Sequence, residues 1–181
     1  METAASEEVQ QGQVAGGQYL TFALGDEQYG IELLKVQEIK GYSAVTPIPN
    51  TPAHIRGVMN LRGAVIPIID LRVRFGMQAI EYTKFNVIIV INVGSRVIGL
   101  LVDAVSDVLN VAAGDLRPAP DFGDRVDTSF ISGMAATGEN VAVLLNLESL
   151  LSDADLGVAD QVTEANVEPA KSSPEGAAPA R

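Results

Sequence analysis

One stretch of the chain decides the fold, because it encodes a strand, a turn and a second strand. It reads Gly57-Val58-Met59-Asn60-Leu61-Arg62-Gly63-Ala64-Val65-Ile66-Pro67-Ile68-Ile69-Asp70-Leu71-Arg72. The run 65–69 is too short to span a membrane and is rich in β-branched residues, which is typical of a buried strand. Pro67 cannot donate a hydrogen bond to a neighbouring strand, so it predicts an edge strand or a bulge. A turn at Arg62 and Gly63 would hold a long cation on the surface, where a partner gains more from it than the fold does.

Alternating and β-branched segments predict further strands on both sides of this stretch. In the segment 19–24, Leu20, Phe22 and Leu24 share one face, a turn follows at 25–28, and the chain returns over 29–33. We expect more strands at 85–93, 97–102 and 141–145. Helical patterns are short and fall at 32–35, 103–108 and 147–151.

The two halves of the chain repeat the same order of features. With Gly25 aligned to Gly94, Gly30 matches Gly99, Ile31 matches Leu100, Val36 matches Val105 and Glu38 matches Asp107. After a slip in the loop that follows, Gly57 matches Gly133, Val65 matches Val141, Ile68 matches Leu144 and Asp70 matches Asn146. Chance similarity between two β-rich segments is the alternative, but the shared order favours an internal duplication. It predicts two small antiparallel barrels of about five strands each, packed side by side.

Composition sets the boundaries of the folded part. Residues 1–16 have almost nothing to bury and are predicted to be disordered, and residues 153–181 are predicted to form a flexible acidic tail rich in Pro and Ala. The folded part is therefore expected at 17–152. Of the net charge of −11, the two tails carry −3 and −4, which leaves −4 for the middle. This acidity argues against nucleic acid or an anionic membrane surface as the main partner.

Targeting signals are not evident in the sequence. The first residues lack a basic region followed by an apolar stretch, so they do not resemble a secretory signal. No apolar run approaches the length of a membrane helix. We therefore expect a cytoplasmic protein that does not insert into the membrane.

Catalytic and metal-binding patterns are missing from the sequence. There is one histidine, His54, and no cysteine, so a zinc site has no second imidazole or thiolate ligand. No serine lies in a nucleophile elbow, and no glycine-rich loop ends in a P-loop lysine. Asp70 and Asp103 follow strands, where capping a turn is the simpler explanation than a carboxylate pair. We expect neither an enzyme nor a cofactor.

Two surface segments look suited to binding instead. In the segment 36–40 we favour a strand, with Val36, Glu38 and Lys40 on the outward face and Ile39 toward the core. Glu38 would then be able to pair with Arg62, although an ordinary surface ion pair is worth only about 0–1 kcal/mol.

The second segment, 115–123, combines prolines with Arg117 and Phe122. This composition is typical of an interface anchor. The alternative is that Phe122 folds back over the second barrel, and the residues alone favour neither.

Several of these motifs occur together in one known family. In the first half they are Phe22-Ala23-Leu24-Gly25-Asp26-Glu27-Gln28-Tyr29-Gly30-Ile31, Val36-Gln37-Glu38-Ile39, Thr46-Pro47-Ile48-Pro49-Asn50-Thr51-Pro52, Asn60-Leu61-Arg62-Gly63 and Ile69-Asp70-Leu71-Arg72. In the second half they are Val102-Asp103-Ala104-Val105-Ser106-Asp107-Val108-Leu109 and Arg117-Pro118-Ala119-Pro120. Through them the chain resembles the CheW family of bacterial chemotaxis coupling proteins from about residue 18 to residue 151.

The resemblance implies a fold and a role. The implied fold is mainly β, with two SH3-like five-stranded β-barrel subdomains and few short helices, which agrees with the repeat. The implied role is a non-catalytic adaptor that couples the cytoplasmic tips of transmembrane chemoreceptors to the histidine kinase CheA. The regulatory domain of that kinase resembles the family, and the two alternate in rings within arrays at the inner face of the membrane.

The resemblance also assigns site residues. The implied receptor-binding residues are Val36, Glu38, Gly57, Arg62 and Val108. The implied kinase-binding residues are Arg117 and Phe122. A hydrophobic crevice rimmed by Glu38 and Arg62 would grip a receptor helix, and receptor state would be transmitted if the two receptor states bind with different free energy.

Two other functions remain open on the sequence. One is a related adaptor fused to a receiver domain, which the lack of an acidic phosphorylation pocket and of further sequence after Arg181 disfavours. The other is a double barrel that binds a small ligand, or an unrecognised enzyme.

Overall fold

The computed structural model describes residues 17–78, 80–118 and 129–151, together with residues 155 and 157. The chain forms two compact units. Unit 1 comprises Met1–Lys35 and Asp103–Leu150, and unit 2 comprises Val36–Val102 and Leu151–Arg181. The predicted disorder of residues 1–16 and most of the predicted tail 153–181 lie outside the described residues.

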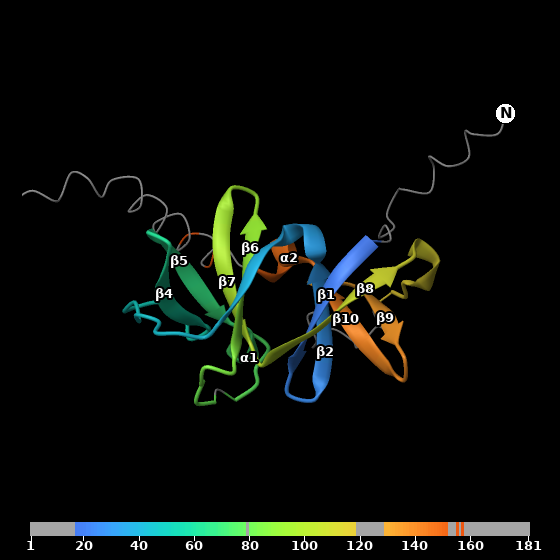
Figure 1. Cartoon of the computed structure of the whole chain (residues 1–181), viewed down its shortest axis with the longest axis horizontal. Coiled ribbons are helices and arrows are strands. Elements are labelled where there is room, and N and C mark those ends of the chain that lie inside the picture. The colour runs from blue at the N-terminus through green and yellow to red at the C-terminus, as the bar shows by residue number, and fades with distance from the viewer. Residues whose placement is uncertain (1–16, 79, 119–128, 152–154, 156, 158–181) are drawn as a thin grey trace, which may run out of the picture. The chain divides into compact units, whose positions relative to one another are not determined.

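Unit 1 contains a five-stranded sheet in the order β8-β1-β2-β10-β9 (Figure 1). Its strands are β1 (Gly17–Leu24), β2 (Glu27–Glu32), β8 (Ala104–Val111), β9 (Ile131–Thr137) and β10 (Asn140–Leu145). Neighbouring strands are antiparallel except β10 and β2, which run parallel. The short helices of this unit are η2 (Leu33–Lys35), η3 (Ala113–Asp115) and α2 (Leu147–Leu150).

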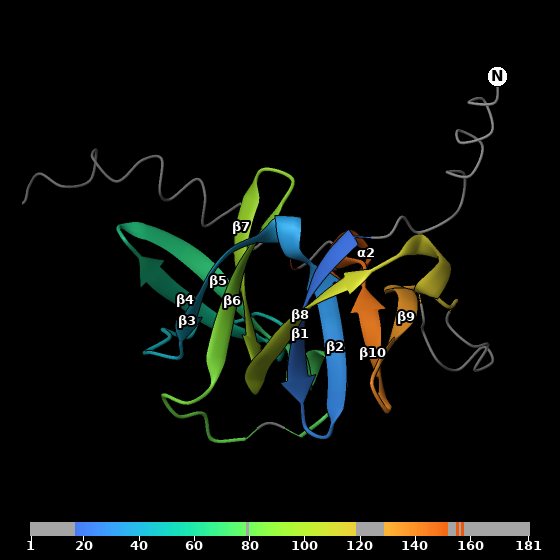
Figure 2. The same cartoon turned by 45° about the vertical axis from the view of Figure 1, so that its right-hand side comes forward.

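Unit 2 contains a second five-stranded sheet, in the order β3-β6-β7-β5-β4. Its strands are β3 (Val36–Gly41), β4 (Ile55–Leu61), β5 (Ala64–Asp70), β6 (Val87–Val93) and β7 (Arg96–Val102). Figure 2 shows β3 beside β6, and β3 is one edge of this sheet. Here β5 and β7 form the parallel pair, and the helix α1 (Leu71–Arg74) follows β5 directly.

The two sheets have the same topology. Strands β1 to β5 correspond in order to strands β6 to β10. Exchanging each strand for its counterpart converts the strand order of one sheet into that of the other. Each sheet therefore takes two strands from one half of the chain and three from the other half. The predicted duplication is consistent with this exchange. The parallel pairs β10–β2 and β5–β7 differ from the purely antiparallel barrels that the sequence led us to expect. In each of them, a strand of one half of the chain lies beside a strand of the other half.

Equivalent glycines make room for equivalent aliphatic side chains at the parallel pairs. Leu144 lies opposite Gly30, and Ile68 lies opposite Gly99. A Cβ atom at Gly30 would lie 2.8 Å from Cδ2 of Leu144, and one at Gly99 would lie 2.6 Å from Cδ1 of Ile68. Each sheet therefore contains its own close contact between a glycine and an aliphatic side chain, at an equivalent position.

Aliphatic clusters stabilise each sheet by removing apolar surface from water. In unit 1 the buried cluster contains Tyr19, Val111, Ala135, Ala142 and Leu144. In unit 2 the buried cluster contains Met59, Leu61, Ile66, Ile68, Ile88, Val90 and Leu101.

The two edges of each sheet approach each other through an isolated bridge. In unit 2, Thr46, which follows β3, bridges to Val58 on β4; in unit 1, Arg117, which follows β8, bridges to Met134 on β9. Neither sheet closes into a complete barrel among the described residues, because no continuous ladder pairs its two edge strands. The bridges bring the two edges of each sheet toward each other, so each sheet is curled.

Three local predictions were wrong. The segment 103–108 begins β8 and is not a helix, because it pairs with β1. Ile39 points outward with Gln37 and is 44% exposed, whereas Val36, Glu38 and Lys40 are half-buried, so β3 alternates in the phase opposite to the predicted one. Pro67 does not lie on an edge strand. The pairing of β5 with β7 begins only at Ile68, and a register shift lies in β4 between Ile55 and Gly57.

Candidate functional site

The tip of the β4–β5 hairpin is formed by a two-residue turn at Arg62 and Gly63. Leu61 pairs with Ala64, and the two turn residues have φ values of 53° and 93°. Positive φ at both positions is the geometry of a type I′ turn, which matches the twist of the flanking strands. Asn60 supports the turn, since its Oδ1 accepts a hydrogen bond of 2.9 Å from the Gly63 amide. An arginine is strained in this conformation, in a position that Asn or Gly would adopt more easily.

Arg62 pairs with Glu38 on β3 through two hydrogen bonds. Arg62 Nη1 donates to Glu38 Oε1 at 3.1 Å, and Nη2 donates to Oε2. The predicted pairing of these two residues is therefore confirmed. The side chain of Arg62 is 68% exposed and that of Glu38 is 25% exposed. Donation from the guanidinium lowers the pKa of Glu38 below its ordinary value, and the same hydrogen bonds raise the pKa of Arg62.

This ion pair joins the two edges of the unit 2 sheet. Glu38 lies on β3 at one edge, and Arg62 directly follows β4, the strand at the other edge. The fork of the guanidinium matches the two carboxylate oxygens, which fixes the direction of both side chains. An exposed pair with this geometry can exchange its partner for a charged group on another molecule.

Val36 and Gly57 support the same region from the backbone. Val36 begins β3 and lies opposite Ile91, next to the bulge that precedes Glu38. Gly57 is buried with φ of 142°, and a Cβ atom there would lie 2.0 Å from the carbonyl oxygen of Thr46. Only glycine fits at this position, so the role of Gly57 in the fold is to let the 46–47 segment cross β4 closely.

A hollow of about 330 Å³ opens beside the hairpin tip. It is lined by Gln37, Leu61, Arg62, Ala64, Val65, Ile66, Pro67, Ser95 and Val97. Its walls come from β3, β4, β5 and the β6–β7 hairpin. Its lining mixes aliphatic side chains with Gln37, Arg62 and Ser95, and protein-binding surfaces commonly have such a mixed composition.

The structure places four of the five expected receptor-binding residues in unit 2. They are Val36, Glu38, Gly57 and Arg62. The fifth, Val108, lies exposed on β8, an edge strand of unit 1.

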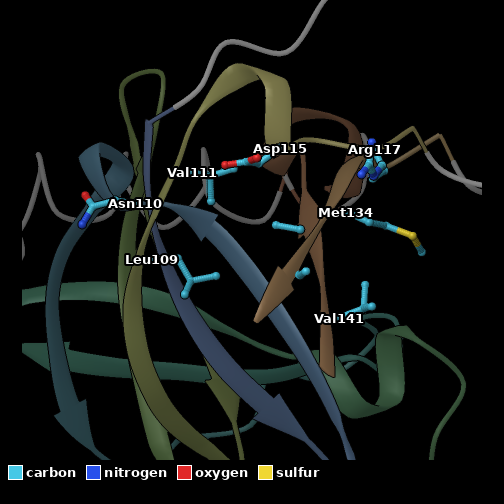
Figure 3. Close-up of a pocket in the computed structure, with 9 residues that line it drawn as sticks. Leu109, Asn110, Val111, Asp115, Arg117, Met134 and Val141 are labelled. Carbon is cyan, nitrogen blue, oxygen red and sulfur yellow. The ribbon is translucent and has the colours of Figure 1, made fainter. Parts of the chain in front are cut away.

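Arg117 lines a different hollow, in unit 1. This hollow has a volume of about 360 Å³, and its other lining residues are Leu109, Asn110, Val111, Asp115, Met134, Ala135, Ala136 and Val141. Figure 3 shows Asp115 and Arg117 at one end of it, with Leu109 and Val141 at the other end. The backbone of Arg117 is held by two hydrogen bonds with Met134, of 2.9 and 2.8 Å. Phe122, the second expected kinase-binding residue, lies outside the described residues.

The polar residues considered for chemistry have structural partners. Asp70 caps α1 by accepting from the Val73 amide and also accepts from the Tyr82 hydroxyl, which lies at 2.5 Å. Asp103 accepts from the Gly25 amide at 2.7 Å. His54 lies in the turn before β4, and its Nε2 is 2.6 Å from Oδ1 of the buried Asp155. These contacts confirm the capping roles of the two strand-end aspartates.

Sequence reasoning missed a second exposed ion pair, between Lys35 and Glu148. Lys35 Nζ donates to Glu148 Oε2 at 2.6 Å. The two residues are separated by 113 positions, so no local pattern could reveal their contact. Among the described residues, no group of three or more histidine and carboxylate side chains is arranged to hold a metal. The same part of the chain contains no helix that is long and apolar enough to cross a membrane.

Comparisons with known proteins agree with this architecture. Residues 18–155 match the model of the CheW-like domain. Chemotaxis protein CheW of Klebsiella aerogenes is 48% identical over 155 residues, which cover 86% of this chain and 93% of that protein. Chemotaxis protein CheW of Rhizobium meliloti is 44% identical over 135 residues, covering 75% and 87%.

A solved structure has the same fold. The crystal structure of the scaffolding protein TtCheW from Thermoanaerobacter tengcongensis matches with a TM-score of 0.70 at 33% identity, and the match covers 77% of this chain and 95% of that one. The fold and the hairpin site define a mainly β binding module of two sheets with one shared topology. The family match and the identity to the two CheW proteins show that the chain belongs to the CheW family.

Proposed function

We propose that this protein is a non-catalytic chemotaxis adaptor that couples the cytoplasmic tips of chemoreceptors to the histidine kinase CheA. Membership of the CheW family supports this role, and the name of TtCheW describes that relative as a scaffolding protein. The observation that carries the proposal is the exposed Arg62–Glu38 pair on a strained hairpin tip. A strained residue that holds a charged group at the surface is characteristic of functional sites.

The receptor-facing surface would be the outer side of unit 2. Arg62 and Glu38 would make polar contacts with the receptor tip, and the hollow beside them would take an apolar side chain. Val36 and Gly57 would hold β3 and β4 in place, and Val108 would contribute from unit 1. A receptor state that binds this surface more tightly would shift the assembly toward the kinase state coupled to it.

The kinase-facing surface would include Arg117 and Phe122 in unit 1. The regulatory domain of CheA would bind there, so that adaptor and kinase assemble into arrays. The protein would then act in the cytoplasm, at the inner face of the membrane, through its partners.

The domain organisation belongs to the same proposal. The folded part would be residues 17–152, with each sheet curled into an SH3-like barrel. The matching topology of the sheets and the two isolated bridges support a barrel and an origin by duplication.

The test is a binding experiment with purified components. The protein is mixed with a receptor cytoplasmic fragment and with the CheA regulatory domain, and complex masses are measured by light scattering after gel filtration. We expect both binary complexes and a ternary complex. Arg62→Ala should lose the receptor complex at an unchanged melting temperature, while Lys84→Ala, which removes another exposed cation from unit 2, should bind as the wild type does. A folded wild-type protein that binds neither partner would overturn the proposal.

A further inference from the structure

The connection from β2 to β3 has little support from the hydrophobic core. It consists of η2, and none of its three residues is buried. Leu34 in its centre is 98% exposed. A short connection without buried side chains is free to move unless polar contacts hold it. The ion pair of Lys35 with Glu148 supplies such a contact.

Glu148 is a firm anchor for this connection. It belongs to α2, where Leu147 and Leu150 are buried in unit 1. The preceding residue, Asn146, caps this turn, since its Oδ1 accepts from the Ser149 amide at 3.1 Å, and its own amide donates to the Phe130 carbonyl at 2.7 Å. The backbone of Glu148 is therefore held by the core of unit 1, and its exposed carboxylate extends from a fixed turn to Lys35.

Lys35 is the last residue before the chain enters the receptor-facing strand. Val36, the next residue, begins β3 in unit 2, and Glu38 follows two positions later. The bulge of β3 lies between these two residues, so the direction of Glu38 depends on how the chain enters the strand. Because β3 is an edge strand, β6 is its one partner in the sheet order. A shift at Lys35 would reach Glu38 over a few peptide units.

The electrostatics of the two groups agree with a formed pair. The hydrogen bond to Glu148 raises the pKa of Lys35, and the same contact lowers the pKa of Glu148. The side chains are 27% and 55% exposed, so the pair adds little to global stability. We expect the Lys35–Glu148 pair to affect the position of β3, the strand that follows Lys35.

We propose that Lys35 and Glu148 are positioning residues that set the entry of β3 and thereby the direction of Val36 and Glu38, without touching the receptor themselves. This inference rests on the proposed function for its effect on receptor binding. Its effect on β3 can be measured in the isolated protein.

The experiment compares Lys35→Met and Glu148→Gln with matched controls. Lys84→Met and Glu139→Gln make the same chemical changes at other exposed positions. Amide hydrogen exchange is followed for β3 and, as an internal reference, for β10. We expect both test variants to speed exchange in β3 and to leave β10 and the melting temperature unchanged. Receptor-fragment affinity should fall roughly fivefold, which corresponds to about 1 kcal/mol.

A charge swap sharpens the test. The double variant Lys35→Glu with Glu148→Lys should restore slow exchange in β3 and most of the affinity, whereas each single reversal should be worse than the neutral variants. Wild-type exchange in β3 for both neutral variants would overturn the inference. If exchange changes as expected but the wild-type protein does not bind the receptor fragment, the positioning role stands and the proposed function fails. If the wild-type protein binds the receptor fragment and both neutral variants keep wild-type exchange and affinity, the inference fails and the proposed function stands.

Discussion

Arg62 shows how a single residue can be costly for the fold and useful for binding. Its φ of 53° lies in the left-handed region, where a side chain with a Cβ atom is strained. The hydrogen bonds to Glu38 hold the guanidinium in one direction, so a partner meets a preorganised group. Stability and binding should therefore respond in opposite directions when this residue is replaced by one that tolerates a positive φ.

Arg62→Asn tests that opposition. Asparagine tolerates the left-handed conformation, so we expect stability to rise by up to roughly 1 kcal/mol while receptor-fragment affinity falls at least about tenfold. Urea unfolding measures the first quantity and titration calorimetry the second. A variant that loses stability as well as affinity would show that the ion pair holds the hairpin in the folded protein.

The Glu38 carboxylate gives a prediction for pH. Its pKa in the folded protein is lowered by the hydrogen bonds from Arg62, so the pair favours folding above the ordinary pKa of glutamate. The contribution is lost as the pH falls through the lowered pKa of the folded state. Carbon-detected NMR should find the Glu38 midpoint below the ordinary value for glutamate, and Arg62→Gln should raise it. Equal midpoints in the wild type and in Arg62→Gln would contradict the pairing in solution.

Gly57 is a packing residue with a sharp test. Gly57→Ala adds a Cβ atom 2.0 Å from the Thr46 carbonyl oxygen at a positive φ, so we expect a loss of about 3 kcal/mol. Gly63→Ala is the matched control, because it also has positive φ but meets nothing within 4 Å, and should cost only about 1 kcal/mol. Urea unfolding of both variants measures the difference. Similar losses would mean that backbone strain, and not the close approach, decides the cost.

At the scale of the elements, each parallel pair joins a strand of one half of the chain to a strand of the other half, as the antiparallel pairs β1–β8 and β3–β6 also do. Each parallel pair places a glycine of a hairpin strand under an aliphatic side chain of the exchanged strand. Gly99 is the more crowded, because a Cβ atom would approach both Ile68 and Ile88, at 2.6 and 2.9 Å. Overpacking at such a position forces the neighbours out of their rotamers.

Alanine at the two glycines should therefore destabilise unequally. We expect Gly99→Ala to cost about 2–3 kcal/mol and Gly30→Ala about 1–2 kcal/mol, because Gly30 meets one flexible methyl group. Adding Ile68→Val to Gly99→Ala should recover part of the loss, since it removes the atom that clashes. Chemical denaturation of the wild type, Gly99→Ala, Ile68→Val and the double variant completes this double-mutant cycle. Additive losses in the double variant would place the strain elsewhere.

The elements also show how far sequence patterns reach. Alternation and the Arg62-Gly63 turn predicted most strands, because hairpins are local. The pairing of Glu38 with Arg62 was also predicted, although it joins opposite edges of the unit 2 sheet. The segment 103–108 was misread, since its pairing with β1 spans more than eighty positions and overrides its local pattern. The face of Ile39 was misread because strict alternation shows that two faces exist but not which of them is buried. The Lys35–Glu148 pair has no local signal.

At the scale of the whole molecule, the exchange of strands makes the two halves interdependent. Neither half contains all the strands of either sheet. The sequence repeat suggested one barrel from each half, and only the pairing between distant strands reveals the exchange. Such pairings depend on the whole fold, so periodicity cannot predict them.

A split protein tests this interdependence. Fragments 1–76 and 77–181, separated in the connection between α1 and β6, should each fail to give a dispersed amide spectrum alone. Mixed at equal concentration, they should assemble and recover the native spectrum. A single fragment that folds cooperatively by itself would show that one half forms its own core.

The strand exchange also sets an order for folding on the ribosome. Unit 2 has all five of its strands once Val102 has emerged, but the sheet of unit 1 lacks its last strand until Leu145 is made. The β1–β2 hairpin is synthesised first and must wait longest, with the backbone groups of its free edges exposed. The earliest part of this chain is thus the last to find its neighbours. A pause in translation before β10 would leave it exposed to aggregation and to chaperones.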